Sequence, residues 1–239
     1  DLKKNGIDIF FAPTSFIIPA LAPKNIKTIV TVHDLVAFLF PKIHQAKATL
    51  VEKLFLRRAL WRAARVVCVS ENTKRDLMKM FHVLKEKIEV VYPAGSVGAG
   101  EAHYVIPSPP EADEESSPPH HGATSPHETR SLTPALQGIR DDKGYILGVG
   151  TLEPRKNFQT LINAFALFHE KNPGVRLVIA GGEGWKEKLH IPDGLPVEFL
   201  GYVAQDQLAQ LYRNALMFVF PSLYEGFGIP PLEAMASSV

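Results

Sequence analysis

The chain has 239 residues, with 26 lysines and arginines against 25 aspartates and glutamates, which gives a formal net charge of +1. This balance provides no electrostatic case for binding nucleic acid or an anionic membrane surface, and we expect no nucleic-acid partner. Cys68 is the only cysteine. Disulfides within the chain and a cysteine-rich zinc site are therefore excluded, and a reducing compartment such as the cytoplasm is expected.

The most apolar stretch of the sequence, Ile7–Ala22, is interrupted by Asp8, Pro13 and Pro19. A membrane-spanning helix needs about 20 consecutive apolar residues, so this stretch is a poor candidate for one. We predict a buried strand followed by a loop. The first residues also lack the basic region and apolar run of a secretory leader.

Residues 1–93 and 143–239 each alternate short β-branched runs with helical patterns. In the first zone we predict strands at Ile7–Ala12, Thr28–His33, Arg65–Ser70 and Lys87–Tyr92, and helices at Leu50–Ala64 and Glu71–Phe81, with Ser70 as N-cap of the second helix. In the second zone we predict strands at Tyr145–Gly150, Arg176–Gly181, Val197–Gly201 and Met217–Ser222, and helices at Asn157–Lys171, Lys186–Leu189 and Gln205–Ala215.

Residues 94–142 break this alternation, because they are rich in proline, serine, glycine, histidine and acidic residues. Such a stretch buries too little apolar surface to offset the entropy of ordering it, so we predict a disordered linker. The strand–helix alternation on either side implies parallel sheets. We therefore expect an α/β protein with two facing, doubly wound, Rossmann-like domains. Both domains look incomplete, because the chain starts at Asp1 and stops at Val239 inside an apparent helix.

The sharpest motif follows the last predicted strand. It runs from Pro221 to Ser238 (PSLYEGFGIPPLEAMASS) and places Glu225 before Gly226-Phe227-Gly228, then Pro230-Pro231 opening a helix with Glu233 in its first turn. Glycines let backbone amides approach an anion closely, and a helix start offers free N–H groups and partial positive charge. The arrangement predicts a phosphate site at the carboxyl end of a parallel strand.

With seven residues between Glu225 and Glu233, this motif resembles the E-x7-E signature of retaining GT-B glycosyltransferases, glycosyltransferase family 4 in particular. The alternative is an ordinary Gly-Pro turn with two solvated carboxylates. A second element of the same family, E-x-RKN, is similar to Thr151–Asn157 (TLEPRKN). Arg155 and Lys156 there can neutralise a diphosphate, Arg as a bidentate fork and Lys as a point charge. An Arg-Lys pair more often lies in a solvated loop. Here the pair precedes the E-x7-E motif in the order expected for the family, which favours a role in binding the diphosphate.

His33 is the last residue of the predicted strand Thr28–His33, and a histidine at the carboxyl end of a strand can point into an interdomain cleft and titrate near neutrality. The family carries a matching histidine near the donor sugar and acceptor; the alternative is a turn histidine with structural bonds. The resemblance implies that His33 and Glu225 act at the reaction centre. It also implies that Arg155, Lys156, Gly226, Phe227, Gly228 and Glu233 bind the donor with Glu225, with Glu225 on the sugar hydroxyls and Glu233 on the ribose.

The resemblance implies transfer of a hexosyl group with retention, from a nucleoside diphosphate sugar to a glycan or lipid-linked acceptor, without a cofactor or metal. GDP-mannose is the first expected donor, followed by UDP-glucose or a UDP-hexosamine. The complete protein is expected in the cytoplasm, with peripheral association at the inner face of the membrane. Two rivals stay open. One is a non-catalytic module that binds the donor. The other, an oxidoreductase, predicts GxGxxG with an acidic residue about 20 positions on, which the sequence lacks.

Overall fold

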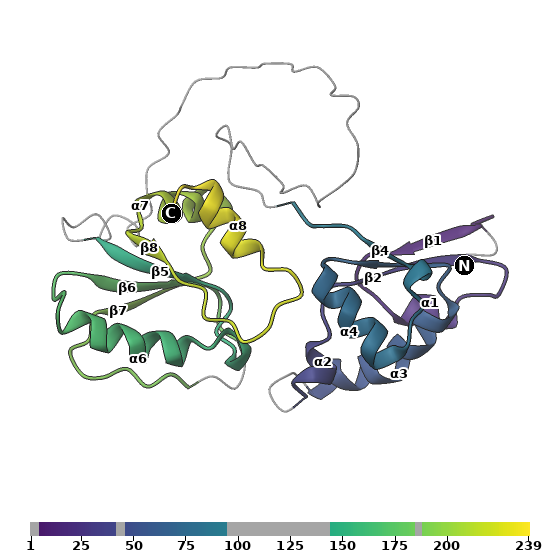
Figure 1. Cartoon of the computed structure of the whole chain (residues 1–239), viewed down its shortest axis with the longest axis horizontal. Helices are drawn as coiled ribbons and strands as arrows, with labels where there is room; N and C mark the ends of the chain where they lie inside the picture. Colours follow the sequence, from purple (N-terminus) through teal and green to yellow (C-terminus); the bar gives the residue numbers. More distant parts are fainter. Residues whose placement is uncertain (1–4, 42–45, 95–143, 185–187) are drawn as a thin grey trace, which may run out of the picture.

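The computed structural model describes residues 5–41, 46–94, 144–184 and 188–239. These residues form two α/β domains that lie side by side, each built on a four-stranded parallel sheet (Figure 1). The linker predicted at 94–142 lies outside the described residues, apart from residue 94. The α/β class and the two Rossmann-like domains expected from the alternating pattern are confirmed.

The elements of the N-terminal domain are, in chain order, β1 (Ile9–Ala12), α1 (Ile17–Leu21), β2 (Lys27–Val32), α2 (Val36–Leu39), α3 (Ala46–Arg62), β3 (Arg65–Cys68), α4 (Glu71–Phe81), the 3₁₀ turn η1 (Lys85–Lys87) and β4 (Ile88–Val90). Those of the C-terminal domain are β5 (Tyr145–Val149), the 3₁₀ turn η3 (Pro154–Lys156), α6 (Phe158–His169), β6 (Arg176–Ala180), β7 (Val197–Gly201), α7 (Gln205–Asn214), β8 (Met217–Phe218) and α8 (Ile229–Ala236).

The strands of the N-terminal sheet pair in chain order, β1-β2-β3-β4, and every pair is parallel. Right-handed crossovers between successive neighbours carry the connecting helices to the same face of a sheet. Figure 1 shows α1 to α4 beneath this sheet accordingly. The core between the layers contains fully buried Val30, Leu56, Val66 and Leu77. His33 and Ser70 follow the carboxyl ends of the two central strands.

The C-terminal sheet has the order β7-β6-β5-β8, so the direction of winding reverses at β5. Helix α6 covers one face and α7 with α8 the other (Figure 1). Two buried clusters correspond to the two faces, one around Leu147 and Tyr212 and the other around Phe158 and Ile162. The neighbouring strands β5 and β8 therefore form the switch point of this sheet.

All eight predicted strands and the helices α3, α4, α6 and α7 are confirmed to within about four residues. The prediction that β1 is buried was wrong, because Ile9 and Phe11 are 60% and 54% exposed. Ser70 caps α4 as predicted, because its Oγ accepts a hydrogen bond from the Thr73 amide at 3.1 Å. Among the described residues, no helix is both long and apolar enough to cross a membrane.

Several boundaries were wrong. Part of the stretch expected to be a loop after β1 forms the short helix α1, and β8 ends at Phe218 instead of reaching Ser222. The helix expected at 186–189 lies partly outside the described residues, and Lys188 and Leu189 are not helical. Helix α8 stops at Ala236 because Ser238 adopts a left-handed conformation. It starts at Ile229, so Glu233 is its fifth residue and lies beyond the first turn.

The core of the C-terminal domain predicts a stability difference between two leucines. Leu147 in β5 is fully buried, whereas Leu167 in α6 is 69% exposed. We expect Leu147→Ala to lower the free energy of unfolding by about 2–5 kcal/mol, because it leaves a cavity, and Leu167→Ala to change it by about 0.5 kcal/mol or less. Urea denaturation of both variants measures this. Equal losses would contradict the placement of β5 at the centre of the sheet.

Candidate functional site

The candidate site lies where the chain leaves β5 and β8. These strands are parallel neighbours, with Ile146 opposite Met217 and Leu147 opposite Phe218. Their carboxyl ends therefore share one edge, from which the chain departs to α6 on one face and α8 on the other (Figure 1). In open α/β sheets, ligands bind in the crevice at such a switch point. Both predicted motifs come from these two departing loops.

A cluster of buried charges joins the two loops. Glu225 accepts from Arg155 Nη1 at 2.5 Å and from Lys156 Nζ at 2.7 Å. Arg155 also pairs through Nη2 with Glu153. The four side chains are between 5% and 18% exposed, so water screens these contacts only weakly. The sequence had assigned the cations and Glu225 to different parts of a donor, but here they neutralise one another.

The pKa shifts follow from this pairing. Burial by itself would raise the pKa of Glu225, but the hydrogen bond from Lys156 and the charges of Lys156 and Arg155 hold it below the ordinary value of a carboxyl group. Burial would lower the pKa of Arg155, yet the charges of Glu225 and Glu153 raise it. Glu225 and Arg155 are therefore both charged at neutral pH.

Main-chain contacts hold the cations in place. Arg155 and Lys156 lie in η3, which ends at Asn157 in a left-handed conformation. Asn157 Nδ2 donates to the carbonyl of Pro221 at 3.1 Å, and the Leu223 amide donates to the carbonyl of Arg155 at 2.9 Å. Arg155 Nη1 also donates to the carbonyl of Tyr224 at 2.9 Å. These bonds align the two loops, so that both basic side chains meet Glu225.

Gly226 connects this loop to the N-terminal domain. Its carbonyl accepts hydrogen bonds from Ser70 Oγ at 2.5 Å and from Thr73 Oγ1 at 3.2 Å. A Cβ atom at position 226 would lie 1.7 Å from the carbonyl oxygen of His33, so no other residue fits without movement of the backbone. Gly226 thus allows the loop to pack closely against the carboxyl ends of β2 and β3.

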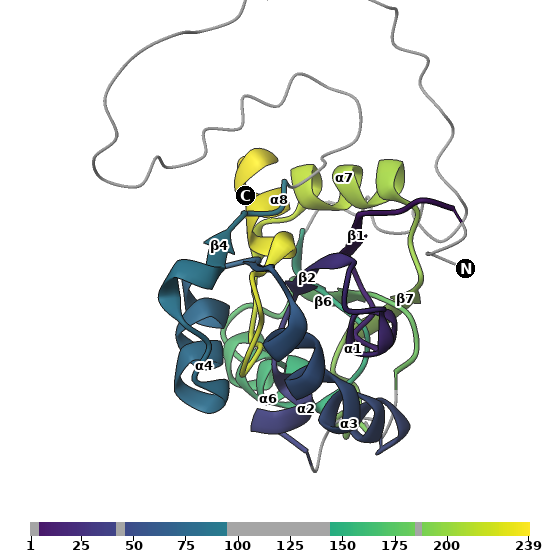
Figure 2. The same cartoon turned by 90° about the vertical axis from the view of Figure 1, so that its right-hand side faces the viewer.

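Tyr224 makes a second contact between the domains. Its hydroxyl donates to Asp76 Oδ2 at 2.8 Å, and its ring packs against Phe40 with centroids 5.8 Å apart. Burial and the hydrogen bond to the Asp76 carboxylate raise the pKa of Tyr224. Figures 1 and 2 show the segment before α8 reaching toward α4. Together with Phe227, whose ring lies 5.8 Å from that of Tyr92, this segment ties the domains together.

Sequence reasoning missed this role of α4, because it gave Ser70 only the role of N-cap. Ser70, Thr73 and Asp76 recur every three residues and therefore lie along one side of the helix. All three contact residues 224–226. The regular spacing of these three polar residues was the signal in the sequence that could have predicted the contact. We call these three residues the α4 clamp.

The start of α8 differs from the predicted phosphate cradle. Gly228 is its N-cap and has a φ of 99°, which favours glycine. Pro230 and Pro231 occupy the second and third helical positions and carry no N–H group. Of the four amides that a helix start normally leaves free, only those of Gly228 and Ile229 remain. An anion here therefore depends more on Arg155 and Lys156 than the sequence suggested.

Glu233 lies apart from the charge cluster. Its side chain is buried, and its oxygens accept from Gln205 Nε2 and Tyr212 Oη, each at 3.1 Å. Burial, followed by the charge of Glu233 and this hydrogen bond, raises the pKa of Tyr212. In this structure Glu233 therefore fastens α8 to α7.

His33 lies immediately after β2 and is exposed. Its Nε2 lies 2.7 Å from the carbonyl oxygen of Pro13. Because a carbonyl only accepts hydrogen bonds, Nε2 carries the proton, and Nδ1 is the acceptor in the neutral ring. The backbone of His33 abuts Gly226, and this contact places His33 next to the loop that carries Glu225. Among the described residues, no three His, Cys, Asp or Glu side chains gather in a way that could hold a metal ion.

Comparisons with known proteins identify the family of the chain. Residues 1–94 match the family model described as Glycosyltransferase Family 4, and residues 131–239 match Glycosyl transferases group 1. The chain belongs to the GT-B glycosyltransferases. The E-x7-E and E-x-RKN elements both lie within the second match.

Two curated relatives are O-antigen chain mannosyltransferases. The chain is 29% identical to mannosyltransferase B of Escherichia coli over 89% of its own length and 51% of the relative's. It is 27% identical to RfbU of Salmonella typhimurium over 99% of its length and 56% of the relative's. The chain thus spans about half the length of these relatives. Anabaena HepE, solved with UDP and glucose, shares the fold with a TM-score of 0.65 at 18% identity, over 98% of this chain and 58% of HepE.

The charge cluster of this glycosyltransferase chain predicts a pH-dependent effect of Glu225→Gln. A carboxylate whose pKa is depressed by folding stabilises the fold above its unfolded pKa, and this contribution is lost as the pH falls through the folded value. We therefore expect the stability gap between wild type and Glu225→Gln to be largest near neutral pH and to shrink in acid. Urea denaturation across this range measures the gap. A gap that does not vary with pH would contradict the depressed pKa.

The α4 clamp predicts coupling between residues 148 positions apart. Tyr224→Phe and Asp76→Ala each remove one partner of a charge-assisted hydrogen bond, which contributes about 1.5–3 kcal/mol. The free energies of unfolding of the two single variants and the double variant form a cycle. We expect the double variant to lose less than the sum of the single losses, by about 1 kcal/mol or more. Additive losses would show that the two side chains do not meet.

Proposed function

We propose that this chain carries the donor-binding part of a retaining glycosyltransferase. The enzyme would transfer a hexosyl group from a nucleoside diphosphate sugar to a hydroxyl group of a glycan or lipid-linked acceptor. The observation that carries the proposal is the convergence of Arg155, Lys156 and Glu225 at the switch point of the C-terminal sheet. The two cations suit the negative charge of a diphosphate, and the carboxylate can accept hydrogen bonds from the hydroxyl groups of a sugar.

The proposed binding step is an exchange of partners. In this structure, Glu225 neutralises both cations. An arriving diphosphate carries more negative charge than one carboxylate and offers Arg155 a bidentate partner. It therefore takes over the cations and releases Glu225, whose oxygens then accept hydrogen bonds from the hydroxyls of the donor sugar. Before the donor arrives, Glu225 is acceptor-only, because the two cations hold its pKa below the ordinary range.

The same cations assist the transfer itself. When the bond between sugar and diphosphate breaks, negative charge grows on the leaving phosphate. Arg155 and Lys156, held by main-chain bonds, face this charge without reorganising, which is the usual source of electrostatic catalysis. The positive end of the α8 dipole adds to this effect. We propose that the reaction needs no metal ion and that Glu225 forms no covalent intermediate.

The remaining site residues have proposed roles of their own. His33 contacts the donor sugar at the acceptor side, with Nδ1 as its available acceptor. Gly226, Phe227 and Gly228 line the diphosphate and Glu233 holds the ribose, sharing its carboxylate with Gln205 and Tyr212. The contact between Gly226 and the His33 carbonyl supports these assignments, because it brings the N-terminal histidine to the donor loop.

GDP-mannose is the proposed donor, supported by the mannosyltransferase names of the two curated relatives. UDP-glucose or a UDP-hexosamine is the next candidate. The O-antigen names of the same relatives support a glycan acceptor at a membrane. We accordingly propose that the complete protein works in the cytoplasm, peripherally at the inner face of the membrane.

The diphosphate assignment predicts the effect of removing either cation. In the complete protein, we expect Arg155→Ala and Lys156→Ala each to lower transfer from GDP-mannose by about 10²-fold or more, as for the loss of a preorganised transition-state contact. Arg213→Ala, which removes an exposed cation from α7, serves as the control. Near-normal transfer in either site variant would exclude the diphosphate role. Donor binding without transfer or hydrolysis in the wild type would instead favour a non-catalytic binding module.

A further inference from the structure

Three aromatic rings form a row on the face of the C-terminal sheet that α7 and α8 cover. Tyr212 of α7 meets Phe218 of β8 edge to face, with centroids 5.4 Å apart and ring planes at 69°. Phe218 in turn stacks on Phe220, with centroids 6.1 Å apart and planes at 28°. Residues 218 and 220 point to the same side because side chains alternate along an extended segment. We call Tyr212, Phe218 and Phe220 the aromatic row.

Each end of the aromatic row meets a residue that the proposed function places on the donor. At one end, Lys156 Nζ lies 5.6 Å from the centroid of the Phe220 ring, which is within the range of a cation–π interaction. At the other end, Tyr212 Oη donates to Glu233 Oε2 at 3.1 Å. Lys156 belongs to η3 and Glu233 to α8. The row therefore connects the residue proposed for the diphosphate with the residue proposed for the ribose.

Phe220 differs from an ordinary core residue. Its neighbours in the chain, Phe218 and Val219, each pack against one of the two buried clusters of this domain. Among the described residues, Phe220 belongs to neither cluster. Its ring lies near the start of α8 instead, because a Cβ atom at Gly228 would be 3.7 Å from Phe220 Cε1. The ring thus lies beside both groups proposed to hold the diphosphate, Lys156 and the loop before α8.

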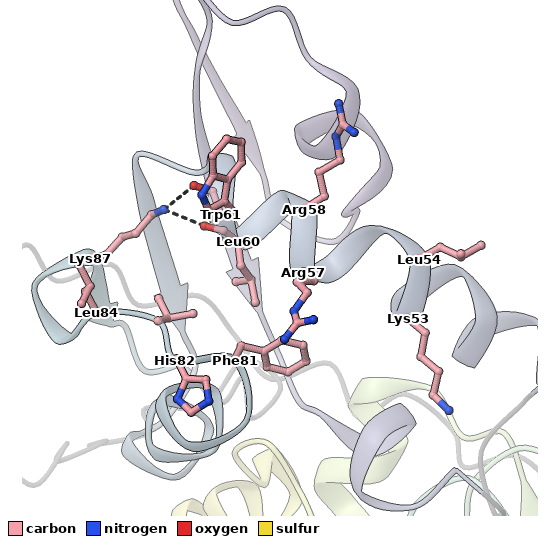
Figure 3. A pocket seen from close by; sticks show the side chains of 11 residues that line it. Lys53, Leu54, Arg57, Arg58, Leu60, Trp61, Phe81, His82, Leu84 and Lys87 are labelled. Atoms are coloured by element: carbon pink, nitrogen blue, oxygen red, sulfur yellow. Dashed lines mark hydrogen bonds between the residues drawn. The ribbon is translucent and has the colours of Figure 1, made fainter.

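The support of Lys156 differs from that of a lysine held by the main chain. Lys87 Nζ donates to the carbonyls of Leu60 and Trp61 at 2.7 and 3.0 Å, in the last turn of α3 (Figure 3). These fixed acceptors leave only one of its three N–H groups for another partner. Lys156 Nζ instead donates to Glu225 at 2.7 Å and lies over a ring. A ring attracts the ammonium group but offers no oxygen that competes with a ligand.

The proposed exchange of partners gives this difference a consequence. When a diphosphate displaces Glu225 from Lys156, the contact with Phe220 remains. Fixing a long, flexible lysine on a ligand costs conformational entropy, and a ring that already holds the ammonium group removes part of that cost. Tyr212 acts in the same way on Glu233, because it fixes one carboxylate oxygen and leaves other lone pairs free for the ribose.

We propose that the aromatic row positions the donor site for a nucleoside diphosphate, with Phe220 holding Lys156 for the diphosphate and Tyr212 holding Glu233 for the ribose. This inference rests on the proposed function and adds two positioning residues to it, each acting through another side chain. The stacked contact through Phe218 makes the two ends one packed unit. Both ends are therefore in place before the donor binds.

The first test is a double-variant cycle on the affinity for GDP, measured by calorimetric titration. Phe220→Leu removes the ring and keeps an apolar side chain. We expect it to lower GDP affinity about fivefold, the cost of ordering one long side chain on a ligand, and to leave guanosine affinity unchanged. In a Lys156→Met background, the same substitution should lower GDP affinity no further, because the contact that it removes is already absent.

The second test uses the other end of the row. Tyr212→Phe keeps the ring and removes only the hydroxyl group that binds Glu233. We expect it to narrow the affinity ratio between GDP and 2′,3′-dideoxy-GDP about fivefold, as for the loss of one buried hydrogen bond, without changing the ratio between GDP and guanosine. Phe220→Leu should do the reverse. A merely structural role would change both ratios in both variants, or neither.

Phe168→Leu is the matched control, since its ring stacks on Phe165 within α6, on the opposite face of the sheet. It should leave both ratios unchanged, and circular dichroism verifies that each variant folds. If the wild type binds GDP but the losses from Phe220→Leu and Lys156→Met add, the inference is overturned and the donor site stands. A wild type that binds neither GDP nor UDP would overturn the proposed function, and the inference with it.

Discussion

The pairing of Glu225 with Arg155 and Lys156 is the interaction on which the rest of this structure depends. Two cations held at the end of a parallel sheet would be costly to bury alone, and one carboxylate makes their burial possible. In the proposed function, a diphosphate replaces this carboxylate without leaving either cation unpaired. Under this proposal, Arg155 and Lys156 contribute both to the stability of the protein and to the binding of the donor.

The segment that carries Glu225 is held from both domains. Arg155 binds it from the C-terminal side, and the α4 clamp of Ser70, Thr73 and Asp76 binds it from the N-terminal side. A change in the relative position of the domains must therefore act on Glu225 directly. The contact of Gly226 with His33 places the N-terminal strand end at the same point. The relative position of the two domains is thus linked to the position of the segment that carries Glu225.

Much of the fold was predictable because its strands are short apolar runs and its helices carry regular patterns, as in Arg65–Ser70 followed by the Ser70 cap. Local motifs also singled out Arg155, Lys156 and Glu225, the residues that the structure brings together in the charge cluster. Their partners were not predictable, because Arg155 meets Glu225 across 70 residues and Tyr224 meets Asp76 across 148, and no local pattern encodes such pairs. One feature was readable and overlooked: consecutive prolines at 230 and 231 remove two amides from the helix start that was expected to bind phosphate.

The most direct test of the account is calorimetric titration of the wild-type chain with guanosine, GMP and GDP at neutral pH. If Arg155 and Lys156 are the grip on the donor, affinity should rise steeply from the nucleoside to the diphosphate and weaken with added salt, since each phosphate gains a charge-assisted contact. Equal affinity for guanosine and GDP, or tight GDP binding that ignores salt, would show that the two cations hold only Glu225.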